Sequence, residues 1–112
     1  MAEARHAMAS VRAVPGLPPY RFIERLAALP FVEALVLYGS RARGDHRPRS
    51  DIDLAVRVPS ADAAQWQQVL DIVDEADTLL GIDCLRLDTL PVNDPLRANI
   101  EREGVEIYRR TA

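Results

Sequence analysis

The spacing of hydrophobic positions changes along the chain, and each change predicts a new helix or strand. Over residues 20–29, apolar side chains recur at steps of three and four, which predicts an amphipathic helix. Residues 34–38 form a short, continuous apolar run, which predicts a strand inside a sheet. Residues 40–43 predict one helical turn, and residues 52–58 predict a second strand whose side chains alternate between two faces.

A longer helix is predicted after the second strand. Ser60 is a suitable N-cap and Gly81 a suitable end, so we expect this helix to extend to about residue 80. Its predicted apolar stripe consists of Trp66, Val69, Leu70, Val73, Ala76 and Leu80. Asp77 belongs to its acidic outer face, where exposure to solvent is the expected role. Residues 82–87 then predict a third strand.

A last helix is predicted near the end of the chain. Asn93 or Asp94 provides its N-cap, and Pro95 lies in its first turn, where proline is favoured. Leu96 and Ile100 are four residues apart, so both are expected to face inward. This helix therefore packs one apolar stripe against the rest of the domain.

Helices and strands interleave along the whole chain, with residues 105–108 as a final short strand. This order predicts an α/β (α+β) domain built on a small mixed sheet with flanking helices. The length of 112 residues is that of one domain, which we place at residues 18–112. Residues 1–17 are expected to form a flexible lead-in.

Composition narrows the classes of function. The net charge of -3 argues against broad binding of nucleic acid, which needs a basic face. The chain contains no lysine, so a Walker P-loop, a protein-kinase fold and a lysyl-adenylate ligase are excluded. Cys84 is the only cysteine, which excludes an internal disulfide framework. Because no apolar run suits a signal peptide or a membrane span, we expect a cytoplasmic protein.

The candidate chemistry centres on two aspartates at the start of the second predicted strand. Asp51 and Asp53 are two residues apart, so their side chains point to the same face of the sheet. Neighbouring carboxylates repel each other unless a cation lies between them, and oxygen ligands suit Mg2+ or Mn2+ better than zinc. Gly39 and Ser40, where the first strand ends, offer backbone N–H groups and a hydroxyl to phosphate oxygens. Together these residues predict nucleotide chemistry.

The spacing of these residues resembles a known signature. Gly39-Ser40, ten intervening residues and then Asp51-x-Asp53 resemble the polymerase-beta-type nucleotidyltransferase superfamily. The surrounding Gly-Ser-Arg-Ala-Arg-Gly and Ser-Asp-Ile-Asp-Leu are most similar to its minimal nucleotidyltransferases (MNT proteins), which are commonly antitoxin partners of HEPN-family toxins. The resemblance extends more loosely over residues 20–108 and implies a polymerase-beta-like nucleotidyltransferase fold.

The resemblance also implies roles for individual residues. Asp51 and Asp53 would hold two divalent ions, Mg2+ or Mn2+, around the triphosphate of ATP, which Gly39 and Ser40 would bind. A third carboxylate would complete the metal site and assist deprotonation of the acceptor. Asp83, at the start of the third predicted strand, is the first choice for this role, and Asp88 is the rival. Tyr38 is expected to be a core residue.

The only dense basic cluster in the sequence lies between the first two strands. It consists of Arg41, Arg43, Arg47 and Arg49, together with His46. Arg41 and Arg43 are candidates for contact with phosphates or with a partner, and a solvated loop is the alternative. Arg47, Arg49 and His46 are expected to be exposed loop residues.

The small size of the chain leaves little surface for an acceptor pocket, so we expect the acceptor on another polypeptide. The leading hypothesis, which the resemblance implies, is an Mg2+-dependent protein adenylyltransferase. This antitoxin would transfer AMP from ATP to a tyrosine of a HEPN-type RNase toxin, silencing it and releasing pyrophosphate. A non-catalytic antitoxin that masks its partner is the second hypothesis. A nucleotidyltransferase for a small molecule is the third, although that function normally needs an added acceptor-binding domain, which we do not expect in this chain.

Overall fold

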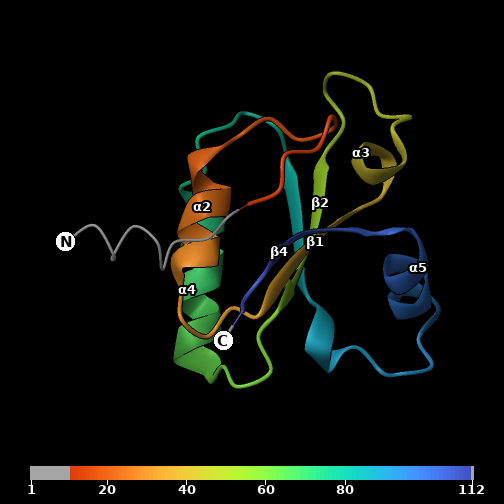
Figure 1. The fold of residues 1–112 in the computed structure, drawn as a ribbon. Helices are drawn as coiled ribbons and strands as arrows, with labels where there is room; N and C mark the ends of the chain where they lie inside the picture. The colour runs from red at the N-terminus through yellow and green to blue at the C-terminus, as the bar shows by residue number, and fades with distance from the viewer. Residues whose placement is uncertain (1–10, 112) are drawn as a thin grey trace.

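A four-stranded sheet forms the centre of the computed structural model, which describes residues 11–111 (Figure 1). Its strands are β1 (Ala34–Tyr38), β2 (Ile52–Arg57), β3 (Ile82–Arg86) and β4 (Val105–Arg109), in the spatial order β3-β2-β1-β4. Strand β1 pairs antiparallel with β2 and β4, whereas β2 and β3 run parallel. The predicted mixed sheet is therefore confirmed, and β1 lies inside it as expected.

Helices cover both faces of the sheet, as Figure 1 shows. Helices α2 (Arg21–Ala28) and α4 (Ala63–Asp74) lie on one face. Helix α5 (Pro95–Glu103) lies on the other face, where it packs with the short 3-10 helix η1 (Leu87–Thr89). The single turn α3 (Ser40–Arg43) follows β1 directly, as predicted. The α/β class expected from the order of the elements is thereby confirmed.

Alternation of side chains along β2 divides the hydrophobic core between the two faces. Leu54 and Val56 are fully buried in the larger cluster, which includes residues of α2 and α4. Ala55, between them, is buried in a smaller cluster with Leu87 and Ile100. Because alternate residues of a strand share a face, the position of Ala55 identifies the face that α5 covers.

A residue from a distant part of the chain completes the first turn of α2. Tyr20 is the N-cap residue, but its side chain makes no capping hydrogen bond. The carboxylate of Asp77 instead accepts hydrogen bonds from the backbone N–H groups of Arg21, at 2.9 Å, and Phe22, at 3.1 Å. The prediction that Asp77 lies on the outer face of a helix is wrong, because it lies beyond α4 and caps α2.

Helix α4 is shorter than predicted at both ends. Asp62, not Ser60, is its N-cap, because the carboxylate of Asp62 accepts a hydrogen bond from the Gln65 N–H at 2.8 Å. The side chain of Gln65 accepts one in return from the Asp62 N–H, which completes a capping box. The helix ends at Asp74, since the residues that follow turn back to cap α2. Gly81 therefore lies in a loop and does not close the helix.

Helix α5 begins as predicted but buries less than predicted. The carboxylate of Asp94 accepts a hydrogen bond from the Leu96 N–H at 2.8 Å, and Pro95 occupies the first turn. Ile100 faces the sheet and is 2% exposed. Leu96 is 41% exposed, so the expectation that it faces inward is wrong. Ile100 is the buried residue of α5, whereas Leu96, one turn nearer the start of the helix, does not pack on the sheet.

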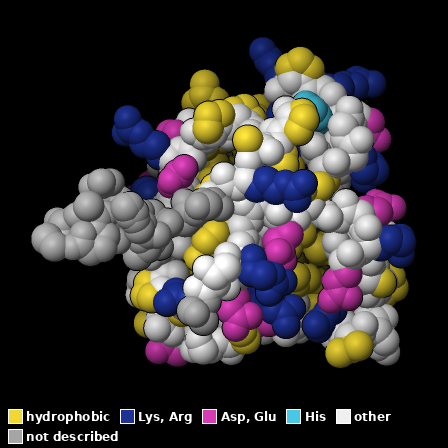
Figure 2. Space-filling view, in the orientation of Figure 1, with side chains coloured by type: hydrophobic (Ala, Val, Ile, Leu, Met, Phe, Trp, Pro, Cys, Tyr) yellow, Lys and Arg dark blue, Asp and Glu magenta, His cyan; other side chains and the backbone are white. Residues whose placement is uncertain are grey.

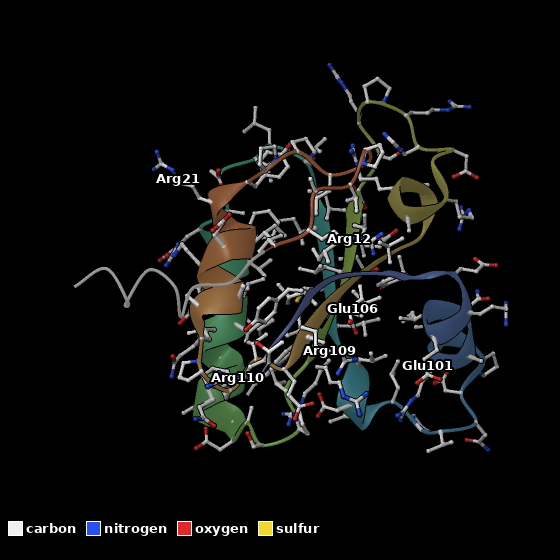
Figure 3. The ribbon with its side chains drawn as sticks, in the orientation of Figure 1. Arg12, Arg21, Glu101, Glu106, Arg109 and Arg110 are labelled. Carbon is white, nitrogen blue, oxygen red and sulfur yellow. The ribbon has the colours of Figure 1, made fainter. Side chains whose placement is uncertain are left out.

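The segment before α2 covers part of one edge of the sheet. Of the predicted lead-in, residues 1–10 lie outside the described residues. Leu17 is buried in the core, and the backbone N–H of Arg12 donates a hydrogen bond to the carbonyl of Ile107 in β4 at 2.6 Å (Figure 3). Residues 11–17 thus pack against the domain. From residue 11 to residue 111, no helix has the length and apolar character needed to cross a membrane.

Candidate active site

Asp53 lies in a row of three side chains that crosses the sheet. In the strand register, Asp53 of β2 is opposite Tyr38 of β1 and opposite Asp83 of β3. Residues paired in this way point to the same face, which is the α5 face because Ala55 packs there. The sheet therefore places Asp83, the predicted third carboxylate, directly beside Asp53.

The carboxylates in this row interact electrostatically. Burial, followed by the charges of Asp83 and Asp51, raises the pKa of Asp53, while Arg43 acts in the opposite direction. Burial, followed by the carboxylates of Asp83 and Asp53, also raises the pKa of Tyr38. The negative charges of Asp51 and Asp83 thus both act on the carboxyl group of Asp53. A divalent cation would relieve this repulsion.

Gly39 makes room for the Asp53 carboxylate. Its backbone has φ 72° and ψ −153°, a region that residues with a side chain rarely adopt. A Cβ atom added to Gly39 would lie 2.2 Å from Oδ2 of Asp53. Glycine is therefore required by both conformation and space, and the turn into α3 lies against the predicted metal ligand.

Gly81 approaches Asp51 in a similar way. A Cβ atom added to Gly81 would lie 2.6 Å from Oδ1 of Asp51. The carbonyl of Gly81 also accepts a hydrogen bond from the Ile52 N–H at 2.8 Å, which joins the starts of β2 and β3. This role of Gly81 was not predicted from the sequence, although a glycine immediately before a strand that carries a candidate ligand was the available signal.

Ser40 follows Gly39 and opens the single turn of α3. It lies near the three aspartates Asp51, Asp53 and Asp83, which we call the acidic row. The N–H groups of Ala42 and Arg43 bond to the carbonyl of Gly39, each at 3.1 Å. The first N–H groups of a helical turn have no partner within the turn, so those at its start are suited to an anion. Gly39 and Ser40 therefore lie where a phosphate bound beside the aspartates would meet backbone donors.

Arg43 lies at the end of the same turn and remains accessible. Its guanidinium pairs with Asp45 at 3.2 Å and with Glu103 at 4.0 Å, and about half of its side chain is exposed. It is also close enough to Asp53 to influence the pKa of that carboxyl group. Contact between Arg43 and a phosphate stays a prediction.

Arg41 has a different position from the one predicted. Its side chain is buried, and its guanidinium donates hydrogen bonds to the backbone carbonyls of Gly16, Ser50 and Pro48. These bonds direct it into the domain, so its geometry does not match contact with a phosphate or a partner. Arg43, Arg47 and Arg49 are exposed, whereas His46, which was expected to be exposed, is partly buried.

Asp88, the rival third carboxylate, lies at the other end of β2. One of its oxygens accepts a hydrogen bond from the Val58 N–H at 2.7 Å, and the other pairs with Arg86 at 3.0 Å. Its side chain is largely buried in these contacts. The arrangement therefore favours Asp83 over Asp88 as the neighbour of Asp53.

The three aspartates have the donor type that a divalent ion needs. Among residues 11–111, no three or more His, Cys, Asp or Glu side chains converge as a ready-made metal site. Asp51 and Asp83 are exposed, and like charges are expected to stay apart without a cation. Carboxylate chemistry and the raised pKa of Asp53 both fit a hard, oxygen-binding ion such as Mg2+ or Mn2+.

Comparison with known proteins gives a family and a fold. Residues 21–112 match the family model described as polymerase beta, nucleotidyltransferase. A toxin-antitoxin crystallised with AMP-PNP is 22% identical, with a TM-score of 0.56 over 80% of this chain and 72% of that chain. A mutant of the toxin-antitoxin MntA-HpeT is 21% identical, with a TM-score of 0.54 over 80% of this chain and 71% of that chain.

A third solved structure, from Sulfolobus solfataricus, is described as a candidate nucleotidyltransferase. It is 20% identical, with a TM-score of 0.52 over 80% of this chain and 76% of that chain. At these identities the likeness to the three structures shows the fold alone. No curated protein matches the chain.

Proposed function

The chain belongs to the polymerase beta nucleotidyltransferase family, and we propose that it acts as a protein adenylyltransferase antitoxin. In this proposal it uses Mg2+ or Mn2+ to transfer AMP from ATP to a tyrosine hydroxyl of a HEPN-type toxin. Family membership supports nucleotidyl transfer. The toxin-antitoxin structures of similar fold, one of them crystallised with AMP-PNP, support a toxin partner and an adenine nucleotide.

One observation carries the proposal: Asp53 and Asp83 are paired on neighbouring strands and so share a face of the sheet, with Gly39 packed against Asp53. A structural role does not need two adjacent carboxylates whose charges oppose each other, because their repulsion destabilises the fold. Gly39, which both its backbone conformation and the close approach of Asp53 require, adds a second constraint at the same place. The paired carboxylates and the required glycine are both explained if the ends of β1, β2 and β3 that carry them bind a divalent ion and a triphosphate.

The residues have separate tasks in the proposed transfer. Asp51, Asp53 and Asp83 would hold divalent ions, which neutralise the triphosphate and activate the acceptor when bound. Gly39 and Ser40 bind phosphate oxygens through the start of α3. Asp83 accepts the hydroxyl proton as the acceptor oxygen bonds to the α-phosphorus of ATP. The bond between that phosphorus and the bridging oxygen then breaks, and pyrophosphate leaves.

The acceptor in this proposal is a protein rather than a nucleic acid. On the face drawn in Figure 2, basic and acidic side chains are interspersed. On β4, for example, Glu106 pairs with Arg109 at 2.6 Å (Figure 3). A surface of mixed charge does not provide the continuous basic stripe that a phosphate backbone needs. It is compatible with a polypeptide that brings its own hydroxyl to the acidic row.

Intact-mass spectrometry tests the proposal. A HEPN-type protein encoded beside this chain is incubated with it, ATP and Mg2+, and the expected result is the added mass of AMP. Asp83→Asn should abolish the transfer. Asp88→Asn is the matched control, since an amide oxygen can still accept the Val58 N–H far from the acidic row. Equal loss in both variants, or transfer that survives Asp83→Asn, would contradict the assigned roles.

The same experiment separates the alternative functions. A stable complex without any change in mass would favour the non-catalytic antitoxin. If neither a complex nor a mass change is found, the partner assignment is wrong and the acceptor is to be sought among small molecules. Transfer from GTP but not ATP would overturn the choice of nucleotide while leaving the family chemistry intact.

A further inference from the structure

Arg41 is a buried cation held entirely by backbone carbonyls. It is 6% exposed. Its Nη1 donates to the carbonyl of Gly16 at 2.9 Å, and its Nε donates to that of Ser50 at 3.1 Å. Its Nη2 is shared between the carbonyls of Pro48, at 3.2 Å, and Arg47, at 3.5 Å. Within the described part of the chain, no carboxylate forms an ion pair with it.

The carbonyls that Arg41 binds belong to two segments that are otherwise far apart in sequence. Three of them lie in the loop between α3 and β2, and the last of these, Ser50, immediately precedes Asp51. The fourth is that of Gly16, in the segment before α2. A Cβ atom added to Gly16 would lie 2.1 Å from the carbonyl oxygen of Arg41, so the two backbones are in close contact.

A buried guanidinium without a carboxylate is costly unless its N–H groups are satisfied. Removal of the side chain would therefore release several carbonyls of one loop at once. That loop also has a turn of its own, in which the Arg47 N–H bonds to Oγ of Ser50 and the Ser50 N–H bonds to the Arg47 carbonyl. Arg41 thus links this turn to the segment before α2.

We propose that Arg41 is a positioning residue for the metal-binding aspartates. It holds the loop before β2 so that Asp51 and Asp53 enter the strand facing Asp83 and Gly39. It acts only through backbone carbonyls and does not touch the substrate. This inference rests on the proposed function, because it concerns the same acidic row, but it assigns the adjacent arginine a task other than phosphate binding.

The geometry of the side chain explains why arginine is needed here. Guanidinium presents its donors in a planar fork, and Arg41 uses three nitrogens to reach carbonyls in different directions. A lysine ammonium has a single nitrogen and cannot reach the same set. Arg41→Lys should therefore keep a positive charge but lose most of the loop contacts.

The test compares Arg41→Met with Arg86→Met. Arg86 is a matched control because its Nη2 also binds backbone carbonyls, those of Val58 at 3.1 Å and Ala61 at 3.0 Å, at the opposite end of β2. Two quantities are measured without any acceptor: the affinity for Mn2+ by titration calorimetry, and amide hydrogen exchange of residues 44–51 in the metal-free protein.

The two variants should behave differently. Arg41→Met should lose at least about tenfold in Mn2+ affinity, the size of effect known for residues that support metal ligands. It should also lose amide protection in residues 44–51 while the protein stays folded. Arg86→Met should melt at a lower temperature but bind Mn2+ like the wild type. Arg41→Lys should resemble Arg41→Met. If the methionine variant does not fold, the same two quantities are measured on the lysine variant instead.

Unchanged Mn2+ affinity and unchanged exchange in a folded Arg41 variant would overturn the inference. Equal loss of Mn2+ affinity in Arg86→Met would also overturn it, because the effect would then follow from general destabilisation. A wild-type protein that binds no Mn2+ would instead count against the proposed function. In that case the hydrogen exchange still decides whether Arg41 holds the loop.

Discussion

The most direct test of the acidic row is a single added methyl group at Gly39. Gly39→Ala places a Cβ atom 2.2 Å from Oδ2 of Asp53, and Asp53 must move away. The substitution also forces a residue with a side chain to adopt φ 72° and ψ −153°. Such a conformation costs about 1 to 3 kcal/mol. The substitution should thus damage both the fold and the position of a predicted ligand.

Gly44→Ala is the matched control at the other end of α3. Gly44 also has a positive φ, of 88°, but an added Cβ atom meets nothing within 4 Å. The expected cost is that of a left-handed residue alone, about 1 kcal/mol. For a domain of this size, 1 kcal/mol lowers the melting temperature by roughly 4 to 8 °C. Gly39→Ala should lower it further.

The assay is thermal unfolding with and without Mn2+ and a non-hydrolysable ATP analogue. Ligand at about 100 times its dissociation constant stabilises the native state by about 2.7 kcal/mol. The wild type and Gly44→Ala should both gain this stability, whereas Gly39→Ala should gain little. If Gly39→Ala melts like Gly44→Ala and is stabilised equally by the ligands, the close approach to Asp53 has no role in binding.

Three further substitutions test other parts of the structure. Asp53→Asn should stabilise the metal-free protein at neutral pH by about 1 kcal/mol, the size of a solvent-screened interaction between neighbouring charges. Because the pKa of Asp53 is raised in the folded state, this gain should vanish as the pH falls through that pKa; thermal unfolding between pH 7 and pH 4 measures it. Asp77→Ala should lower the melting temperature by removing the cap of α2. The hydrogen bonds lower the pKa of Asp77, so its stabilising contribution is present above about pH 4 and is lost as the pH falls through the lowered pKa. The difference in melting temperature between the wild type and Asp77→Ala should therefore be smaller at acidic pH than at neutral pH. Ile100→Ala should cost about 2 to 4 kcal/mol in urea unfolding, whereas Leu96→Ala should change little; similar losses would contradict the packing of α5.

Local patterns in the sequence were sufficient for much of the fold and for the acidic row. The alternation along residues 51–56 predicted that Asp51 and Asp53 share one face of the sheet and that Ile52 and Leu54 share the other. Ile52 and Leu54 are both fully buried, which confirms the prediction for their face. The strand at Ala34–Tyr38 was predicted with its observed bounds. These features depend on neighbouring residues, which the sequence displays directly.

Features that depend on distant residues were not predictable in the same way. Tyr38 was expected in the core, and it does pack, partly buried, against the smaller core cluster, but the register between β1 and β2, which was not predicted, also places it opposite Asp53. The connection between these strands is long and contains a helical turn, so no tight turn sets their register. Arg41 and Asp77 were also misplaced, because their partners lie in segments that only the folded chain brings near.

The position of β1 in the sheet has a consequence for the protein while it is being synthesised. Strand β1 consists of Ala-Leu-Val-Leu-Tyr and pairs with β2 on one side and β4 on the other. Strand β4 leaves the ribosome after all the other described elements, so until then β1 has one open edge. An uncharged apolar edge can pair with the same edge of another nascent chain. Pairing of β4 with β1 therefore closes an apolar edge that the growing chain exposes until its last described strand has been made.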